Sequence, residues 1–172
     1  MSKKSYAKLF VGAIYSDPQW LIKAKSAMQI HGWGIQHQSE EFPFDQTDYY
    51  STEMGEGLKR CFLSIKGLQS LEFSADWKLK TVEIEQQLSN KEKRRINLDP
   101  GYLDLSRVVL LSVKEGSHKI YLRNGVWADL VLLKYKGGYR NFPWTFPDIR
   151  TGRYDDFFLQ LRTEFKNEKS LG

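Results

Sequence analysis

The dipeptide Asn124-Gly125 constrains the fold of this chain more than any other feature of its sequence. Asn and Gly adopt the positive φ angles of a type I′ turn at low cost, so this pair is the strongest local signal for a two-residue β-hairpin. Strand-like segments lie on both sides of the pair, and another precedes them, over residues 102–114, 118–123 and 126–135. Their close spacing predicts an antiparallel meander of three strands.

The first half of the chain alternates strand-like and helical patterns. Short apolar or extended segments predict strands over residues 8–15, 33–44 and 58–66. Apolar residues at helical spacing predict one helix that begins at Asp17-Pro18, with a capping side chain before a proline in the first turn. A second helix is predicted to begin at Ser74.

A third helix is predicted over residues 154–165, where Phe157, Phe158, Leu161 and Phe165 share one apolar face that should pack on the sheet. The first six elements follow the order strand, helix, strand, strand, helix, strand, which is the ferredoxin-like βαββαβ plan. We therefore expect an α+β fold with a ferredoxin-like core, extended by an antiparallel meander and a C-terminal helix. A length of 172 residues fits one domain spanning residues 1–172.

The composition indicates the cellular environment of the protein but not its activity. Cys61 is the only cysteine, so the chain forms no intrachain disulfide and no cysteine-based zinc site. The formal net charge of +5 is a mild excess that does not by itself imply nucleic acid binding. The apolar runs are too short to span a bilayer. We expect a soluble, cytoplasmic protein with no membrane partner.

Several familiar site motifs are absent from the sequence. It contains no phosphate-binding GxxxxGK[ST] loop, no GxGxxG, no HExxH and no GxSxG. Three histidines make a multi-histidine metal site improbable, but a divalent cation such as magnesium prefers oxygen ligands. The polar segment 45–53 supplies Asp45 and Glu53 as candidate metal ligands, and Asp99 could join them.

The segment Asn97-Leu98-Asp99-Pro100-Gly101-Tyr102 has two interpretations. Proline followed by glycine, after an aspartate, predicts a type II turn of purely structural importance. Alternatively, Asn97 and Asp99 lie at the mouth of a strand and face a ligand. Other charged residues are predicted to be solvated: Glu83 and Glu85 on the second helix, and the basic pair Arg94-Arg95, which is also the best nucleic-acid candidate.

Hairpin register predicts a polar cluster on the sheet. If residues 115–117 form a three-residue loop, Lys114 and His118 lie directly opposite each other. If Asn124-Gly125 forms a two-residue turn, Asp129 lies opposite Ile120 and diagonal to His118. His118 could then act as a general acid or base that Asp129 orients. The alternative is an ordinary surface ion pair between Lys114 and Asp129.

Three blocks of the sequence carry a family resemblance: residues 44–60, residues 96–102, and residues 118–122 followed by Trp144-Thr145-Phe146-Pro147-Asp148. Together with Leu9-Phe10-Val11-Gly12, they resemble an uncharacterised bacterial domain family of unknown function. Some members of that family carry an automatic "GTP-binding protein" label. The resemblance covers nearly the whole chain and implies no established activity.

Two function classes follow. In the first, the protein binds a phosphorylated small ligand, such as a nucleotide, together with a divalent cation. Whether it also acts on that ligand is left open. Asp45, Glu53 and Asp99 would then hold the cation, and Arg60, Lys114 and His118 would meet the phosphate. In the second, the chain is a non-enzymatic RNA-binding module whose sheet presents aromatic side chains to unstacked bases. The sequence leaves open whether the protein is an enzyme.

Overall fold

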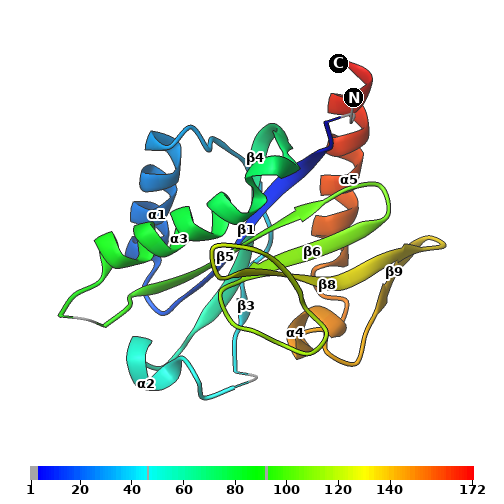
Figure 1. Cartoon of the computed structure of the whole chain (residues 1–172). Coiled ribbons are helices and arrows are strands. Elements are labelled where there is room, and N and C mark those ends of the chain that lie inside the picture. The colour runs from blue at the N-terminus through cyan, green and yellow to red at the C-terminus, as the bar shows by residue number, and fades with distance from the viewer. Residues whose placement is uncertain (1–3, 46, 92) are drawn as a thin grey trace.

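A computed structural model of the chain describes residues 4–45, 47–91 and 93–172. The strands form a nine-stranded sheet whose pairs are all antiparallel, and helices lie on both of its faces (Figure 1). The helices are α1 (Pro18–Ile30), α2 (Ser51–Met54), α3 (Ser74–Leu88), α4 (Pro147–Arg150) and α5 (Asp155–Ser170). The strands are β1 (Tyr6–Tyr15), β2 (Ile35–Gln38), β3 (Phe42–Pro43), β4 (Lys59–Ser70), β5 (Ile96–Leu103), β6 (Arg107–Ser112), β7 (Ile120–Arg123), β8 (Val126–Tyr135) and β9 (Gly138–Asn141). This mixture of helices and antiparallel strands confirms the α+β class.

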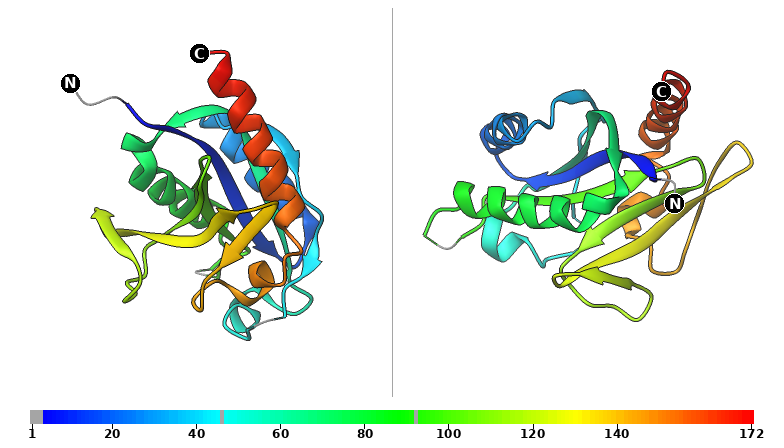
Figure 2. Two further views of the ribbon diagram at one scale, coloured as in Figure 1. Left: turned by 90° about the vertical axis from the view of Figure 1, so that its right-hand side faces the viewer. Right: turned by 45° about the horizontal axis from the view of Figure 1, so that its top comes forward.

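The strand β1 lies in the interior of the sheet, whose order is β2-β4-β1-β5-β6-β8-β7. The short strand β3 pairs with β4, and β9 pairs with β8. Side chains along β1 alternate between two cores because successive residues of a strand point to opposite faces. Leu9, Val11 and Ala13 belong to the core beneath α1 and α3, whereas Phe10 belongs to the core beneath α5. Figure 2 shows α5 across the sheet from α1 and α3.

Local sequence signals explain the helices. The Asp17 carboxylate accepts a hydrogen bond from the Gln19 amide, 2.9 Å away, and Pro18 occupies the first turn of α1 as predicted. Helix α5 buries the predicted apolar face: Phe157, Phe158, Leu161 and Phe165 are each at most 5% exposed. Among the residues that the structure describes, no helix combines the length and the apolar character needed to cross a membrane.

The predicted two-residue turn is confirmed, but the predicted order of the strands around it is wrong. Asn124 and Gly125 adopt φ angles of 53° and 75°, as a type I′ turn requires. However, β6 pairs with β8, and β7 lies at the edge of the sheet. The long apolar strand β8 takes the interior position, while all four residues of β7 are exposed. The three strands therefore do not form a sequential meander.

The segment 102–114 is not one strand but parts of two. The chain reverses after β5, where the Asp104 carboxylate accepts hydrogen bonds from the amides of Ser106 and Arg107 at 2.8 and 3.0 Å. Such a side chain mimics a backbone turn and competes with continued extension. The result is the tight β5–β6 hairpin.

We predict that Leu161→Ala lowers the free energy of unfolding by about 2–5 kcal/mol, because it removes a fully buried side chain from the core under α5. Chemical denaturation measures this change. Leu171→Ala, at a residue that is 88% exposed, should change stability by less than about 0.5 kcal/mol. Equal effects of the two substitutions would show that α5 does not pack as described.

Candidate functional site

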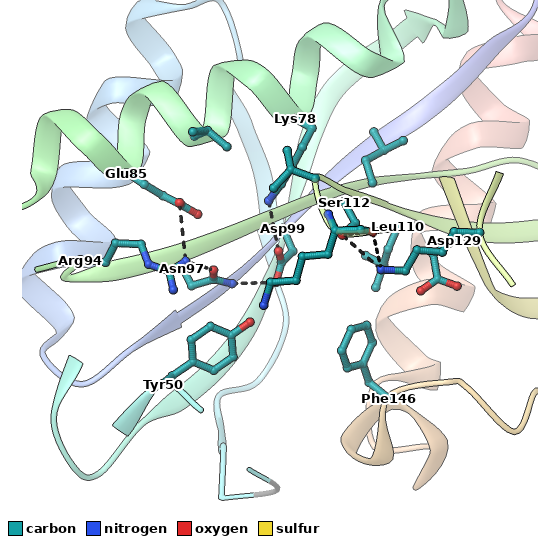
Figure 3. Close-up of a pocket in the computed structure, with 15 residues that line it drawn as sticks. Tyr50, Lys78, Glu85, Arg94, Asn97, Asp99, Leu110, Ser112, Asp129 and Phe146 are labelled. Carbon is teal, nitrogen blue, oxygen red and sulfur yellow. Dashed lines mark hydrogen bonds and ion pairs between the residues drawn. The ribbon is translucent and has the colours of Figure 1, made fainter. Parts of the chain in front are cut away.

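A pocket opens where two neighbouring strands of the sheet diverge. β5 and β6 pair only from Gly101–Leu110 to Leu103–Val108. Beyond that point β5 continues along β1 as far as Ile96, and β6 continues along β8 as far as Ser112. The gap between them holds a cavity of about 260 Å³ (Figure 3). Helix α3 covers one side of this pocket, and the rings of Tyr50 and Phe146 form the other.

Pro100 explains why the β5–β6 ladder ends. Backbone groups alternate between the two neighbours of a strand, and the amide and carbonyl of Leu98 face the gap. Pro100, two residues further on, faces the same side and has no N–H to donate to β6. Gly101 permits the last close pair, since a Cβ there would lie 2.4 Å from the carbonyl oxygen of Val109. The prediction of a type II turn is therefore wrong: this segment lies inside β5.

Two side chains of α3 take the place of the missing strand partner. The Glu85 carboxylate accepts a hydrogen bond from the Leu98 amide at 2.6 Å, and Lys78 Nζ donates to the Leu98 carbonyl at 3.0 Å. Both side chains are buried, and they lie seven residues apart on one face of α3 (Figure 3). The prediction that Glu85 is solvated is wrong, because its carboxylate binds the buried Leu98 amide, which among the described residues has no partner in a neighbouring strand.

A chain of polar contacts continues along the floor of the pocket. Lys78 Nζ lies 3.3 Å from Asp99 Oδ1, and Asn97 Nδ2 donates to Asp99 Oδ2 at 2.7 Å. Arg94 Nη1 donates to Asn97 Oδ1 at 2.9 Å. Both oxygens of Asp99 therefore have partners. Asn97 and Asp99 line the pocket, as their ligand-facing interpretation requires.

Glu53 binds Arg94. The Arg94 side chain and backbone amide donate to the Glu53 carboxylate at 2.8 to 3.1 Å. These hydrogen bonds lower the pKa of Glu53. Arg94, predicted as part of a solvated basic connection, is instead half-buried and lines the pocket.

Glu85 is the unusual acid of the site. Burial raises its pKa to about 7, although Lys78 and the Leu98 amide favour the charged form. Arg94 Nη1 lies 3.9 Å from its second oxygen. The Glu85 carboxyl group therefore changes between its neutral and its charged form near neutral pH.

Two lysines enter the pocket from the connection between β6 and β7. Lys119 Nζ donates to the Lys114 carbonyl at 3.0 Å and to Ser112 Oγ at 3.3 Å. Lys114 Nζ lies 3.8 Å from the centre of the Tyr49 ring, and its hydrogen bond to the hydroxyl lowers the pKa of Tyr49. Within residues 4–45, 47–91 and 93–172, neither lysine forms a salt bridge with a carboxylate.

His118 contacts Asp129, although not through the predicted register. Asp129 pairs with Leu110 of β6, and Ile120 pairs with Ala128. His118 precedes β7, and its Nε2 lies 3.3 Å from Asp129 Oδ1. The imidazole stacks on the Trp144 ring, with centroids 5.0 Å apart. Burial raises the pKa of Asp129, which lines the pocket. The expected direct opposition of Lys114 and His118 is wrong, because β7 pairs with β8 rather than with β6.

Four predicted residues do not line the pocket: Glu53 and His118, which contact the lining residues Arg94 and Asp129, and also Arg60 and Asp45. Arg60 is 1% exposed and binds Asp148 with N–O distances of 3.0 and 3.1 Å. The exposed Asp45 lies outside the pocket lining. In the described part of the chain, no group of three or more His, Cys, Asp or Glu side chains is arranged to hold a metal ion.

Lys78, Glu85 and Arg94 are pocket residues that the sequence argument missed. Lys78, Thr81 and Glu85 recur at helical spacing on α3, and all three are buried, but the sequence alone does not show that this polar face turns inward. A buried polar face of this kind requires a polar partner in the core. Only the divergence of β5 and β6 identifies that partner as the edge of a strand.

Comparison with known proteins places the chain in a family. Residues 5–165 match the family model described as Domain of unknown function (DUF4416). The chain belongs to this family. The expected membership in an uncharacterised family is thereby confirmed. No curated protein and no solved structure matches the chain.

We predict a pH-dependent effect of Glu85→Gln on stability. Because the folded state raises the pKa of Glu85 from 4.5 to about 7, ionisation destabilises the fold as pH rises through this interval. The variant keeps an acceptor for Leu98 but cannot ionise. Its free energy of unfolding relative to wild type should therefore increase between about pH 5 and about pH 8. Chemical denaturation at several pH values measures the difference.

Glu83→Gln is the matched control, since Glu83 is exposed on the same helix. Parallel stability profiles for wild type and Glu85→Gln would contradict the prediction.

Proposed function

We propose that this protein binds a compact phosphorylated ligand, such as a nucleotide, in the pocket between β5 and β6. The observation that carries the proposal is the pair Lys114 and Lys119: both residues line the cavity, and among the described residues neither forms a salt bridge with a carboxylate. Two lysine side chains on the lining of one pocket favour an anion with several acceptor oxygens. Phosphate is such an anion.

The charges on the opposite side of the pocket support this orientation. Lys78 and Arg94 are already matched by Asp99, Glu53 and Glu85. Positive charge that has no carboxylate salt bridge among the described residues is therefore concentrated at the connection 113–119. We assign the phosphate to that end and the uncharged part of the ligand to the β5 end, near Asn97 and Asp99.

The dimensions and walls of the pocket support a compact ligand. Its volume of about 260 Å³ lies just below the range of ~300–1,000 Å³ typical of small-molecule sites. The rings of Tyr50 and Phe146 provide an aromatic wall for a planar group (Figure 3). A nucleoside monophosphate suits these features better than a triphosphate. The proposal does not depend on guanine, for which the sequence offers no motif.

His118 and Asp129 are assigned the acid–base role in this proposal. A histidine that contacts a buried carboxylate and stacks on Trp144 is held in one orientation, which proton transfer requires. Magnesium is a separate expectation. Glu53, a predicted metal ligand, binds Arg94, so we assign the phosphate to the lysines rather than to a bound cation. Titration of the ligand with and without Mg²⁺ tests whether a cation takes part.

We also propose that β1, α1, β2, β4, α3 and β5 form a ferredoxin-like core. Their order in the sheet is β2-β4-β1-β5, and each helix connects two strands that have another strand between them. Both helices pack on the same core, which supports this proposal.

We predict that Lys114→Ala and Lys119→Ala each weaken the binding of adenosine 5′-monophosphate and of inorganic phosphate by about ten- to a hundredfold. Each variant removes one charge-assisted hydrogen bond, worth about 1.5–3 kcal/mol. Isothermal titration calorimetry at fixed ionic strength measures both ligands. Lys80→Ala is the matched control, because Lys80 is paired with Glu83 on the outer face of α3.

Absence of saturable binding of both ligands to wild type would refute the proposal. Binding of mixed-sequence RNA whose affinity falls steeply with salt, without binding of either small ligand, would favour the RNA-binding alternative.

A further inference from the structure

One carboxylate oxygen in the pocket is buried without a hydrogen-bond donor. Asp129 is 3% exposed and lines the cavity. His118 Nε2 lies 3.3 Å from its Oδ1 and favours the charged carboxylate, but among the residues that the structure describes no well-aligned hydrogen bond reaches that oxygen. Buried acceptors are almost always satisfied, and a charged one is especially costly to leave alone.

Asp129 differs in this respect from the other acids of the pocket. Both oxygens of Asp99 have partners, and Glu85 accepts the Leu98 amide. Burial and a fixed position on β8 prevent Asp129 from turning outward into solvent. Figure 3 shows its side chain at the end of the pocket away from Glu85 and Arg94.

We infer that Asp129 is a specificity residue that accepts a hydrogen bond from a hydroxyl of the ligand, which makes the ligand a ribonucleotide rather than a bare phosphate. A neutral hydroxyl is the donor that suits this position, because the charge of Lys119 already favours the ionised Asp129 carboxylate and a second ammonium group would be repelled by Lys119. The ribose supplies hydroxyls on the molecule that also carries the phosphate. Since Lys114, Lys119 and Asp129 line one cavity, a nucleotide that fills it meets all three. This inference rests on the proposed function of the pocket.

The test removes the hydroxyls and the acceptor separately. Calorimetry compares adenosine 5′-monophosphate with its 2′,3′-dideoxy analogue on wild type, Asp129→Ala and Asp129→Asn. Wild type should bind the dideoxy analogue about tenfold more weakly. For Asp129→Ala the ratio of the two affinities should fall to about one, since no acceptor remains. Asp129→Asn keeps the shape and a neutral acceptor, so its ratio should lie between the two.

Controls separate this inference from the proposal beneath it. Asp76→Ala, at a half-buried carboxylate on α3 that binds Arg123 outside the pocket lining, should keep the wild-type ratio. Circular dichroism shows whether each variant is folded. If Asp129→Ala is unfolded, the affinity ratio of Asp129→Asn tests the inference. Equal affinities of wild type for the two nucleotides, or an unchanged ratio in a folded Asp129 variant, would overturn the inference. So would binding of inorganic phosphate without binding of the nucleotide. Failure of both phosphate and nucleotide to bind wild type would refute the proposed function itself.

Discussion

The backbone of Leu98 is held by side chains instead of by a neighbouring strand, and the candidate site depends on this substitution. Glu85 accepts its amide and Lys78 donates to its carbonyl. An unpaired strand edge inside a sheet would otherwise leave buried polar groups unsatisfied. Because α3 satisfies them, β5 and β6 can separate without that penalty. The cavity can form because the side chains of Glu85 and Lys78 replace the two backbone hydrogen bonds that a neighbouring strand would make to Leu98.

The same divergence organises the surrounding charges. Lys78 and Glu85, which hold the backbone of Leu98, also form ion pairs: Lys78 with Asp99 and Glu85 with Arg94. These contacts line the pocket. β6 follows β8, so the chain must pass along the open end of the gap before it reaches β7 at the edge. This connection brings Lys114 and Lys119 into the pocket. The pocket therefore has paired charges on one side and, on the other, two lysines that form no salt bridge with a carboxylate among the described residues.

The sequence predicted the features that depend on neighbouring residues. The turn at Asn124-Gly125 follows from local φ preferences, and the apolar face of α5 follows from helical spacing. It failed where distant segments compete. Pro100 and Gly101 are typical of a turn, yet here the proline ends a ladder and the glycine permits close strand packing. The positions of β7 and β8 were exchanged, because burial in the whole sheet decides which strand lies at the edge.

The candidate site shows the same division. Asn97 and Asp99 were predicted from one sequence block, and Lys114 and Asp129 from a hairpin register that is wrong, yet all four line one pocket. Glu85 could not be found in this way, since a glutamate on a helix is solvated unless a specific partner draws it inward. That partner is the backbone of Leu98, and no local pattern marks a backbone group as unpaired.

Amide hydrogen exchange at Leu98 tests most directly whether α3 replaces a strand partner. The account predicts slow exchange of the Leu98 amide in the wild-type protein, because Glu85 accepts its hydrogen bond in a buried setting. In Glu85→Ala that exchange should become at least about tenfold faster, while amides in the β1–β4 ladder keep their wild-type rates. Fast exchange at Leu98 in the wild type, or an unchanged rate in the variant, would contradict the account.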